Sequence, residues 1–212
     1  MRKLIAVAAV LMLVACTKST SAAALGPSDI AVGSSDLPKA LMRCDGSGDI
    51  DTFLSAIQTK DPNTYKSTKA EWDDAKSHGA TAAVVVFYAD SKDHCASIQN
   101  SKNNDLGSAT FPLVINFVIQ FKDEATAQSG YTNESIFGFS ESTLVTEGGS
   151  GVIKGQDTGL TKNSVALTVA IGAQSFYFAV WQNKAFMVIL GVLNIDIAQA
   201  KKTATTENGR IK

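Results

Sequence analysis

The chain has 212 residues, with 19 Lys and Arg against 20 Asp and Glu and a formal net charge of −1. Nucleic-acid binding needs a concentrated basic face, and this balance, without any run of Lys or Arg, argues against nucleic acid as a partner. Electrostatic attraction likewise adds little to membrane contact.

The first fifteen residues have the composition of an export signal. Arg2 and Lys3 precede an uncharged run of about eleven residues, Leu4 to Val14. A membrane-spanning helix needs about 20 apolar residues, so this run is too short to span a bilayer and fits the apolar core of a signal peptide. We therefore assign residues 1–15 to a signal peptide.

The stretch Leu13-Val14-Ala15-Cys16 resembles the lipobox of bacterial lipoproteins. In that family the cysteine thiol is alkylated with diacylglycerol and the signal is cut just before it. The resemblance implies that Cys16 is lipidated and anchors the protein to the extracytoplasmic side of a cell membrane or outer membrane. Several acyl chains, such as palmitate, make release slow, because a single chain holds only marginally. The alternative is an ordinary signal peptide with an unmodified cysteine.

The chain after the signal divides into a tether and one domain. Residues 16–35 are mostly small and polar without apolar periodicity, which predicts a flexible tether behind Cys16. Residues 36–212 are long enough for a single domain with a real core.

Cys44 and Cys95 are the two cysteines of this domain. Disulfides persist outside the cytoplasm, so we predict that these two residues pair. A loop of about 50 residues closed in this way stabilises the fold by about 4 kcal/mol in the chain-entropy model. Two free buried cysteines are the alternative, and two thiols fall short of a zinc site.

The first half of the domain alternates helical and extended patterns. Four apolar residues recur with the spacing of one helix face: Ile50, Phe53, Leu54 and Ile57. Ser47 or Asp49 can cap this helix, residues 61–63 end it, and Thr68 with Glu71 has the spacing of a capping box for a second helix. The runs 82–89 and 113–121 then predict two strands, each followed by a helix.

From Ser142 onward the pattern indicates mainly β-structure. Residues 165–171 alternate as a half-buried strand, and residues 174–181 and 184–193 predict a hairpin about Gln182-Asn183. Asp196 and Gln199 have capping-box spacing for a last helix. The order predicts an α+β fold, with one largely antiparallel sheet and helices packed mainly on one face. The domain thereby resembles the small α+β exported domains of actinobacterial and related lipoproteins, a likeness that implies no site.

Two glycine-rich stretches and two histidines are candidates for chemistry. Residues 45–51 lack the Gly and Glu of a calcium loop, and residues 147–155 satisfy neither phosphate-loop pattern, so both are interpreted as turns. His78 and His94 could act as bases, but no nucleophile elbow accompanies them. We therefore assign no catalytic residue, no metal site and no cofactor.

The stretch SFYFAVW, residues 175–181, is apolar on both faces of a strand. Phe176 and Phe178 face one way, and Tyr177 and Trp181 face the other. One hypothesis covers both faces with helices and loops. The other leaves the face of Tyr177 and Trp181 open as a groove, where their rings and polar atoms contact an apolar ligand.

These features favour a non-catalytic, membrane-anchored extracytoplasmic lipoprotein that binds an apolar ligand or an envelope protein. A hydrolase of envelope material and a structural subunit of a cell-envelope complex are the alternatives. A pocket holding His78 or His94 beside a Ser and an acid would favour the hydrolase. A large flat apolar patch would favour the structural subunit.

Overall fold

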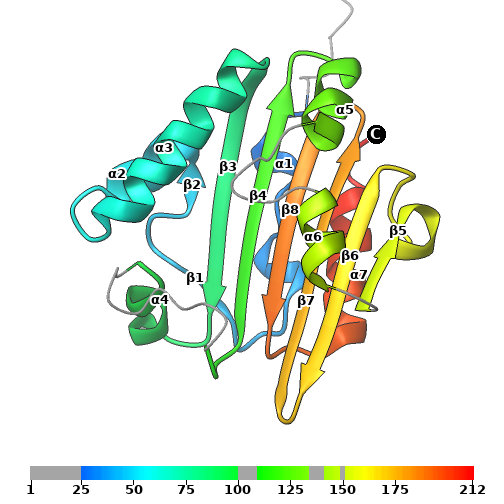
Figure 1. The fold of residues 1–212 in the computed structure, drawn as a ribbon. Coiled ribbons are helices and arrows are strands. Elements are labelled where there is room, and N and C mark those ends of the chain that lie inside the picture. The colour runs from blue at the N-terminus through cyan, green and yellow to red at the C-terminus, as the bar shows by residue number, and fades with distance from the viewer. Residues whose placement is uncertain (1–24, 100–108, 134–140, 149–150) are drawn as a thin grey trace, which may run out of the picture.

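The computed structural model describes residues 25–99, 109–133, 141–148 and 151–212. Within these ranges the chain forms one eight-stranded antiparallel sheet and seven α-helices (Figure 1). The strand order is β1-β3-β4-β8-β7-β6-β5, and the short β2 also pairs with β3. The predicted α+β class and antiparallel sheet are confirmed.

The strands have the following bounds: β1 (Met42–Arg43), β2 (Gly48–Asp49), β3 (Ala80–Ala89), β4 (Leu113–Phe121), β5 (Val152–Lys154), β6 (Ser164–Ile171), β7 (Gln174–Asn183) and β8 (Phe186–Leu193). The helices have these bounds: α1 (Pro27–Ile30), α2 (Ile50–Ile57), α3 (Pro62–Ser77), α4 (Lys92–Ile98), α5 (Glu124–Asn133), α6 (Glu141–Gly148) and α7 (Ile197–Asn208). Two short 3₁₀ turns are η1 (Ser34–Asp36) and η5 (Gly155–Thr158).

The sheet has a core on each of its two faces, because successive strand residues point to opposite sides. The front face, which carries α2 to α6, presents residues such as Phe87 and Phe178 (Figure 1). The rear face, which carries α1 and α7, presents residues such as Tyr88 and Trp181. Most helices therefore lie on one face, as predicted.

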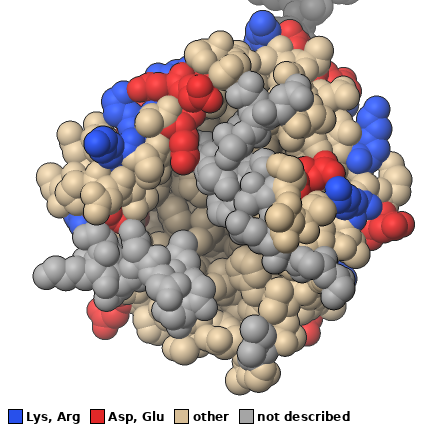
Figure 2. All heavy atoms as spheres, in the orientation of Figure 1, with Lys and Arg blue, Asp and Glu red and all other residues tan. Residues whose placement is uncertain are grey.

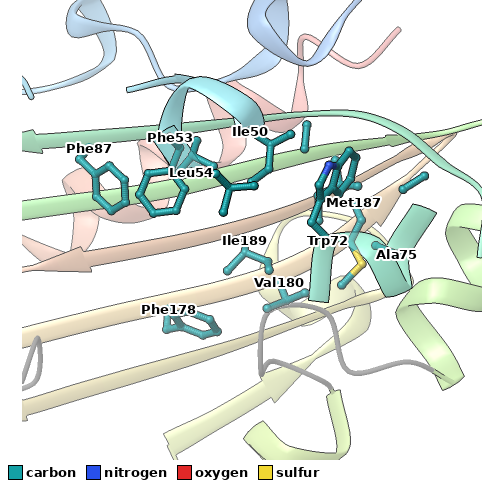
Figure 3. Packing of buried hydrophobic residues seen from close by; sticks show 14 of the residues in the cluster. Ile50, Phe53, Leu54, Trp72, Ala75, Phe87, Phe178, Val180, Met187 and Ile189 are labelled. Carbon is teal, nitrogen blue, oxygen red and sulfur yellow. The ribbon is translucent and has the colours of Figure 1, made fainter. Parts of the chain in front are cut away.

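Helix α2 packs on the front face through the predicted apolar stripe. Asp49 caps the helix by accepting a hydrogen bond from the Thr52 backbone N–H. The four stripe residues are all buried: Ile50, Phe53, Leu54 and Ile57. Figure 3 shows Phe53 beside Phe87 of β3, and their ring centroids lie 5.4 Å apart.

Helix α3 begins earlier than predicted. The 61–63 segment was expected to end a helix, and Thr68 to open the next one. Instead Asp61 caps α3 by accepting from the Thr64 N–H, and Pro62 occupies the first turn. A proline at that position loses no helical hydrogen bond, so here it starts a helix rather than stopping one.

Two expectations for the second half are also corrected. The segment from residue 142 was expected to be extended, but residues 141–148 form helix α6. The hairpin turn lies two residues beyond Gln182-Asn183, because β7 continues to Asn183 and Lys184 adopts a left-handed conformation with φ of 48°. The last helix, α7, is capped by Asp196 as predicted.

The tether predicted to run to residue 35 ends earlier, because the chain is folded from Gly26 onward. Helix α1 and turn η1 lie against the rear face, and Ile30 has no exposed surface. The Val32 N–H donates to Asn116 Oδ1 at 3.0 Å, and Tyr88 Oη donates to the Val32 carbonyl at 2.9 Å. These buried hydrogen bonds make residues 26–36 part of the domain. Cys16 lies outside the described residues.

The predicted disulfide is confirmed. Cys44 and Cys95 are joined, with their Cα atoms 5.3 Å apart and a sequence separation of 51. The bond ties the chain after β1 to helix α4 at one end of the front face. Among helices of the described ranges, none is both long and apolar enough to cross a bilayer.

Candidate functional site

A groove with a volume of about 520 Å³ lies on the front face, between α2, α3 and α4 on one side and α6 on the other. Figure 2 shows a hollow in this face, and its visible floor comes from residues other than Lys, Arg, Asp and Glu. The described residues that line the groove share an apolar character with few exceptions: Phe53, Ile57, Phe87, Ile98, Ile115, Phe117, Leu144, Leu167, Phe176, Phe178, Ile189, Gly191 and Leu193, with the polar Asp61, Thr64, Thr68 and Gln99.

Aromatic rings on both sides shape the groove. Phe117 of β4 meets Phe53 and Phe87 edge-on, at centroid distances of 6.2 and 6.4 Å. On β7, Phe176 and Phe178 stack with centroids 6.1 Å apart. Figure 3 shows Phe53 and Phe87 at one side of the cluster and Phe178 at the other. Such fixed, edge-on ring contacts stabilise a preformed apolar surface.

Gly191 gives the groove its depth in the middle of the sheet. It lies on β8 directly opposite Phe178 of β7 and Ile115 of β4. A Cβ atom added here would lie 3.6 Å from the Phe178 ring, which is an ordinary contact, so the backbone does not require glycine. Glycine inside a strand often marks a close approach by a ligand or another backbone. Here its missing side chain leaves space above the floor.

The polar groups of the groove gather toward α3 and α4. Asp61, 1% exposed, caps α3 through the Thr64 N–H at 3.1 Å. Gln99 follows α4, accepts a hydrogen bond from Lys60 Nζ at 3.1 Å and donates one to the Asp45 carbonyl. The groove is therefore amphipathic along its length, with an apolar body and a polar margin.

Tyr177 and Trp181 do not line this groove, which corrects the hypothesis that they contact a ligand. Both lie on the rear face, where Tyr177 is 1% and Trp181 0% exposed. They pack in one cluster with Ala200 and Ala204 of α7. Burial raises the pKa of the Tyr177 hydroxyl to about 12. The strand is apolar on both faces because one face meets α7 and the opposite face lines the groove.

The two histidines lie outside the groove lining. His94 Nδ1 contacts Asp90 Oδ1 at 2.5 Å, and its ring stacks on Phe111 with centroids 3.9 Å apart. The Nδ1 atom of His78 faces both Ser77 Oγ, at 3.3 Å, and Asp74. A Ser-His-Asp site instead uses opposite ring nitrogens for the serine and the acid.

No metal site was identified in the part of the chain that the structure describes, where no three His, Cys, Asp or Glu residues gather as ligands. Among its described residues, the groove lining supplies one carboxylate, that of Asp61, with two threonine hydroxyls and one amide. This donor set can orient the polar end of a bound molecule. Sequence reasoning missed the groove residues, and the glycine within the apolar 186–193 strand was the signal that could have found them.

No protein-family model and no curated protein matches the chain. Among solved structures, the fold is similar to that of the extracellular domain of PknH from Mycobacterium tuberculosis. The TM-score is 0.47 and the identity 11%, over 87% of this chain and 93% of that one.

Proposed function

We propose that this protein is a non-catalytic, lipid-anchored extracytoplasmic lipoprotein whose domain binds an apolar small molecule in the front-face groove. The observation that carries the binding part is the groove itself. Its volume of about 520 Å³ lies within the range of roughly 300–1,000 Å³ that is usual for small-molecule sites. Five strands supply its apolar floor, and a few polar groups lie at one margin.

The shape of the groove favours a small molecule over an envelope protein as the occupant. Helices bound it on two sides, α2 to α4 and α6, so an elongated chain or ring fits more readily than a broad protein surface. Removing apolar ligand surface from water contributes roughly 25 cal/mol per Å² before the costs of association. An apolar ligand can therefore bind here without any strong polar contact.

The side chains of the lining favour binding over hydrolysis. Among the described lining residues there is no Ser, Cys, His or Lys, and the one carboxylate, Asp61, serves as a helix cap. Nucleophilic catalysis needs an activated nucleophile with a base within hydrogen-bond reach. A ligand that enters this groove meets mostly aromatic rings and aliphatic side chains.

The anchoring part of the proposal is supported by the lipobox-like stretch that ends at Cys16. Its test is metabolic labelling of the expressed full-length chain with an alkyne-tagged palmitate, in a bacterial host with lipoprotein processing. We expect label on the wild-type protein and none on a Cys16→Ala variant. The variant Cys44→Ala is the matched control and should keep the label. An unlabelled wild-type protein found in the membrane-free fraction would contradict the anchor.

The binding part is tested by titrating the purified protein with a fluorescent long-chain acyl probe. The variant Gly191→Leu places a side chain above the groove floor, and we expect it to weaken probe binding at least tenfold. Ala70→Leu adds similar bulk on an exposed part of α3 and is the matched control. Thermal unfolding of both variants checks that the fold is kept. Equal probe affinity in the folded Gly191→Leu protein, or no affinity in the wild type, would overturn the proposal.

A further inference from the structure

A second, smaller pocket adjoins the polar end of the groove. It has a volume of about 140 Å³ and is lined by the disulfide and its neighbours. Gln99 lines both pockets and is buried between them. The two hollows are therefore two compartments on either side of one side chain.

The smaller pocket has a net positive charge, whereas the groove is apolar. Among the described residues, the charged side chains that line it are those of Lys60, Lys92 and Asp45, with a formal charge of +1. Arg43 also borders it, but this residue pairs with Tyr88 and its side chain points to the rear face. The two cations come from the turn between α2 and α3 and from the start of α4. Their gathering at one pocket arises from the tertiary fold, since no basic run exists in the sequence.

The fold also fixes these cations at the end of the groove. Lys60 Nζ donates to Gln99 Oε1 at 3.1 Å, so one ammonium group lies directly at the boundary between the compartments. Lys92 lies in the same short helix as Cys95. The disulfide from Cys95 to Cys44 therefore fixes this helix to the end of β1.

We propose that the groove ligand is a single-chain amphiphile with an acidic head group, a carboxylate or a phosphate. Its hydrocarbon chain lies in the groove, and its head lies past Gln99 against Lys60 and Lys92. This inference rests on the proposed binding function of the groove. Hydrogen bonds from Arg or Lys to a carboxylate or phosphate are about twice as strong as neutral ones.

The carboxylate of Asp61 gives a second reason for this orientation. It is buried in the groove lining at the start of α3, where the dielectric constant is low. Another anion placed beside it would therefore be repelled. An acidic head is therefore more stable in the cationic compartment than in the body of the groove. A neutral ligand of equal chain length experiences neither effect.

The experiment compares ligands that share one chain and differ in the head group. Dodecanoate, dodecyl phosphate, dodecanol and dodecylamine displace the fluorescent acyl probe from the purified protein, and inorganic phosphate is added alone. We expect both acidic amphiphiles to bind about tenfold more tightly than dodecanol, and this advantage to shrink as salt is raised. Inorganic phosphate alone should not displace the probe.

The matched variants are the double substitution Lys60→Gln with Lys92→Gln and, on the opposite face, Lys201→Gln. None of these residues lines the groove. The double variant should remove most of the dodecanoate advantage and leave dodecanol affinity unchanged, and Lys201→Gln should change neither. Equal affinities of the wild type for dodecanoate and dodecanol would overturn this inference while the proposed function stands. Binding of phosphate as tightly as dodecyl phosphate would also overturn it, and no binding of any amphiphile would overturn both proposals.

Discussion

The guanidinium group of Arg210 joins the two ends of the domain by an ion pair with Asp36, whose Nη2–Oδ1 distance is 2.5 Å. Its Nη1 atom also donates to the backbone carbonyls of Ile30 and Ala31, at 3.0 and 3.1 Å. Arg210 follows α7, and the other three residues belong to the segment from α1 to η1. Gln199 Nε2 and Thr203 Oγ1 of α7 both donate to the Asp36 carbonyl, so these side chains together with Arg210 hold the beginning of the domain against its last helix.

Replacing Arg210 with Ala should lower the free energy of unfolding by about 3 kcal/mol, because Asp36 would remain largely buried without its partner. Urea denaturation measures the change. Arg210→Lys keeps the charge but loses the planar guanidinium group. Its free energy of unfolding should therefore lie between those of the wild type and the Ala variant. A loss below about 0.5 kcal/mol in the Ala variant would show that the contacts of Arg210 do not stabilise the fold.

Glu207 of α7 predicts a pH dependence of stability. Its side chain faces the rear core and is 0% exposed, and burial raises its pKa well above 4.5 despite opposing effects of Asn116 and Arg210. The folded protein therefore holds a proton that the unfolded chain releases above about pH 4.5. The contribution of Glu207 to stability should be fully present below that pH and fall as pH rises toward the folded-state pKa, by at most about 1.4 kcal/mol per pH unit.

The variant Glu207→Gln isolates this contribution because it cannot ionise. Urea denaturation between about pH 5 and pH 8 should show a flatter profile than that of the wild type, and higher stability at the alkaline end. Glu124→Gln, on the exposed part of α5, is the control and should leave the profile unchanged. Parallel profiles of wild type and Glu207→Gln would refute the assignment.

Removing the disulfide should destabilise the domain by about 4 kcal/mol, since it closes a loop of 51 residues. The measurement is the denaturation midpoint of the Cys44→Ala/Cys95→Ala protein, compared with the oxidised wild type. Reduced wild-type protein should match the double variant. If reduction left the midpoint unchanged, the cross-link would add nothing to stability.

Trp181 should contribute to stability and not to ligand affinity, because it is buried beneath α7 on the face opposite the groove. Trp181→Ala should lower the free energy of unfolding by about 3–5 kcal/mol. The milder Trp181→Phe variant should stay folded and bind the acyl probe with wild-type affinity. If the folded Trp181→Phe protein bound the probe more weakly, the ligand would have to bind on the rear face instead.

Local patterns predicted much of the fold. The stripe of α2, with Asp49 as its cap, depends only on helical spacing and short-range hydrogen bonds. The 113–121 strand was found with its observed bounds, because its apolar run is long and rich in branched and aromatic residues. The start of α3 was missed because a proline after a possible cap can either stop or begin a helix.

The site depended on tertiary information. Residues 175–181 are apolar on both faces, so alternation alone did not show which face α7 would cover. The choice is determined by Ala200 and Ala204 of α7, which pack against the face of Trp181, and by Gly191, which hollows the other. The segment of Ile30 was assigned to the tether because its anchoring partners lie far away in sequence.

The contact between Arg210 and the Ile30 carbonyl spans 180 residues of sequence. A ribosome delivers a chain from its N-terminus at roughly 5–20 residues per second, so the Ile30 carbonyl is made 180 residues before the guanidinium group that binds it. Chains that stall or are clipped just before Arg210 keep every described strand of the sheet, yet they lack the ion pair with Asp36 and the hydrogen bonds to Ile30 and Ala31.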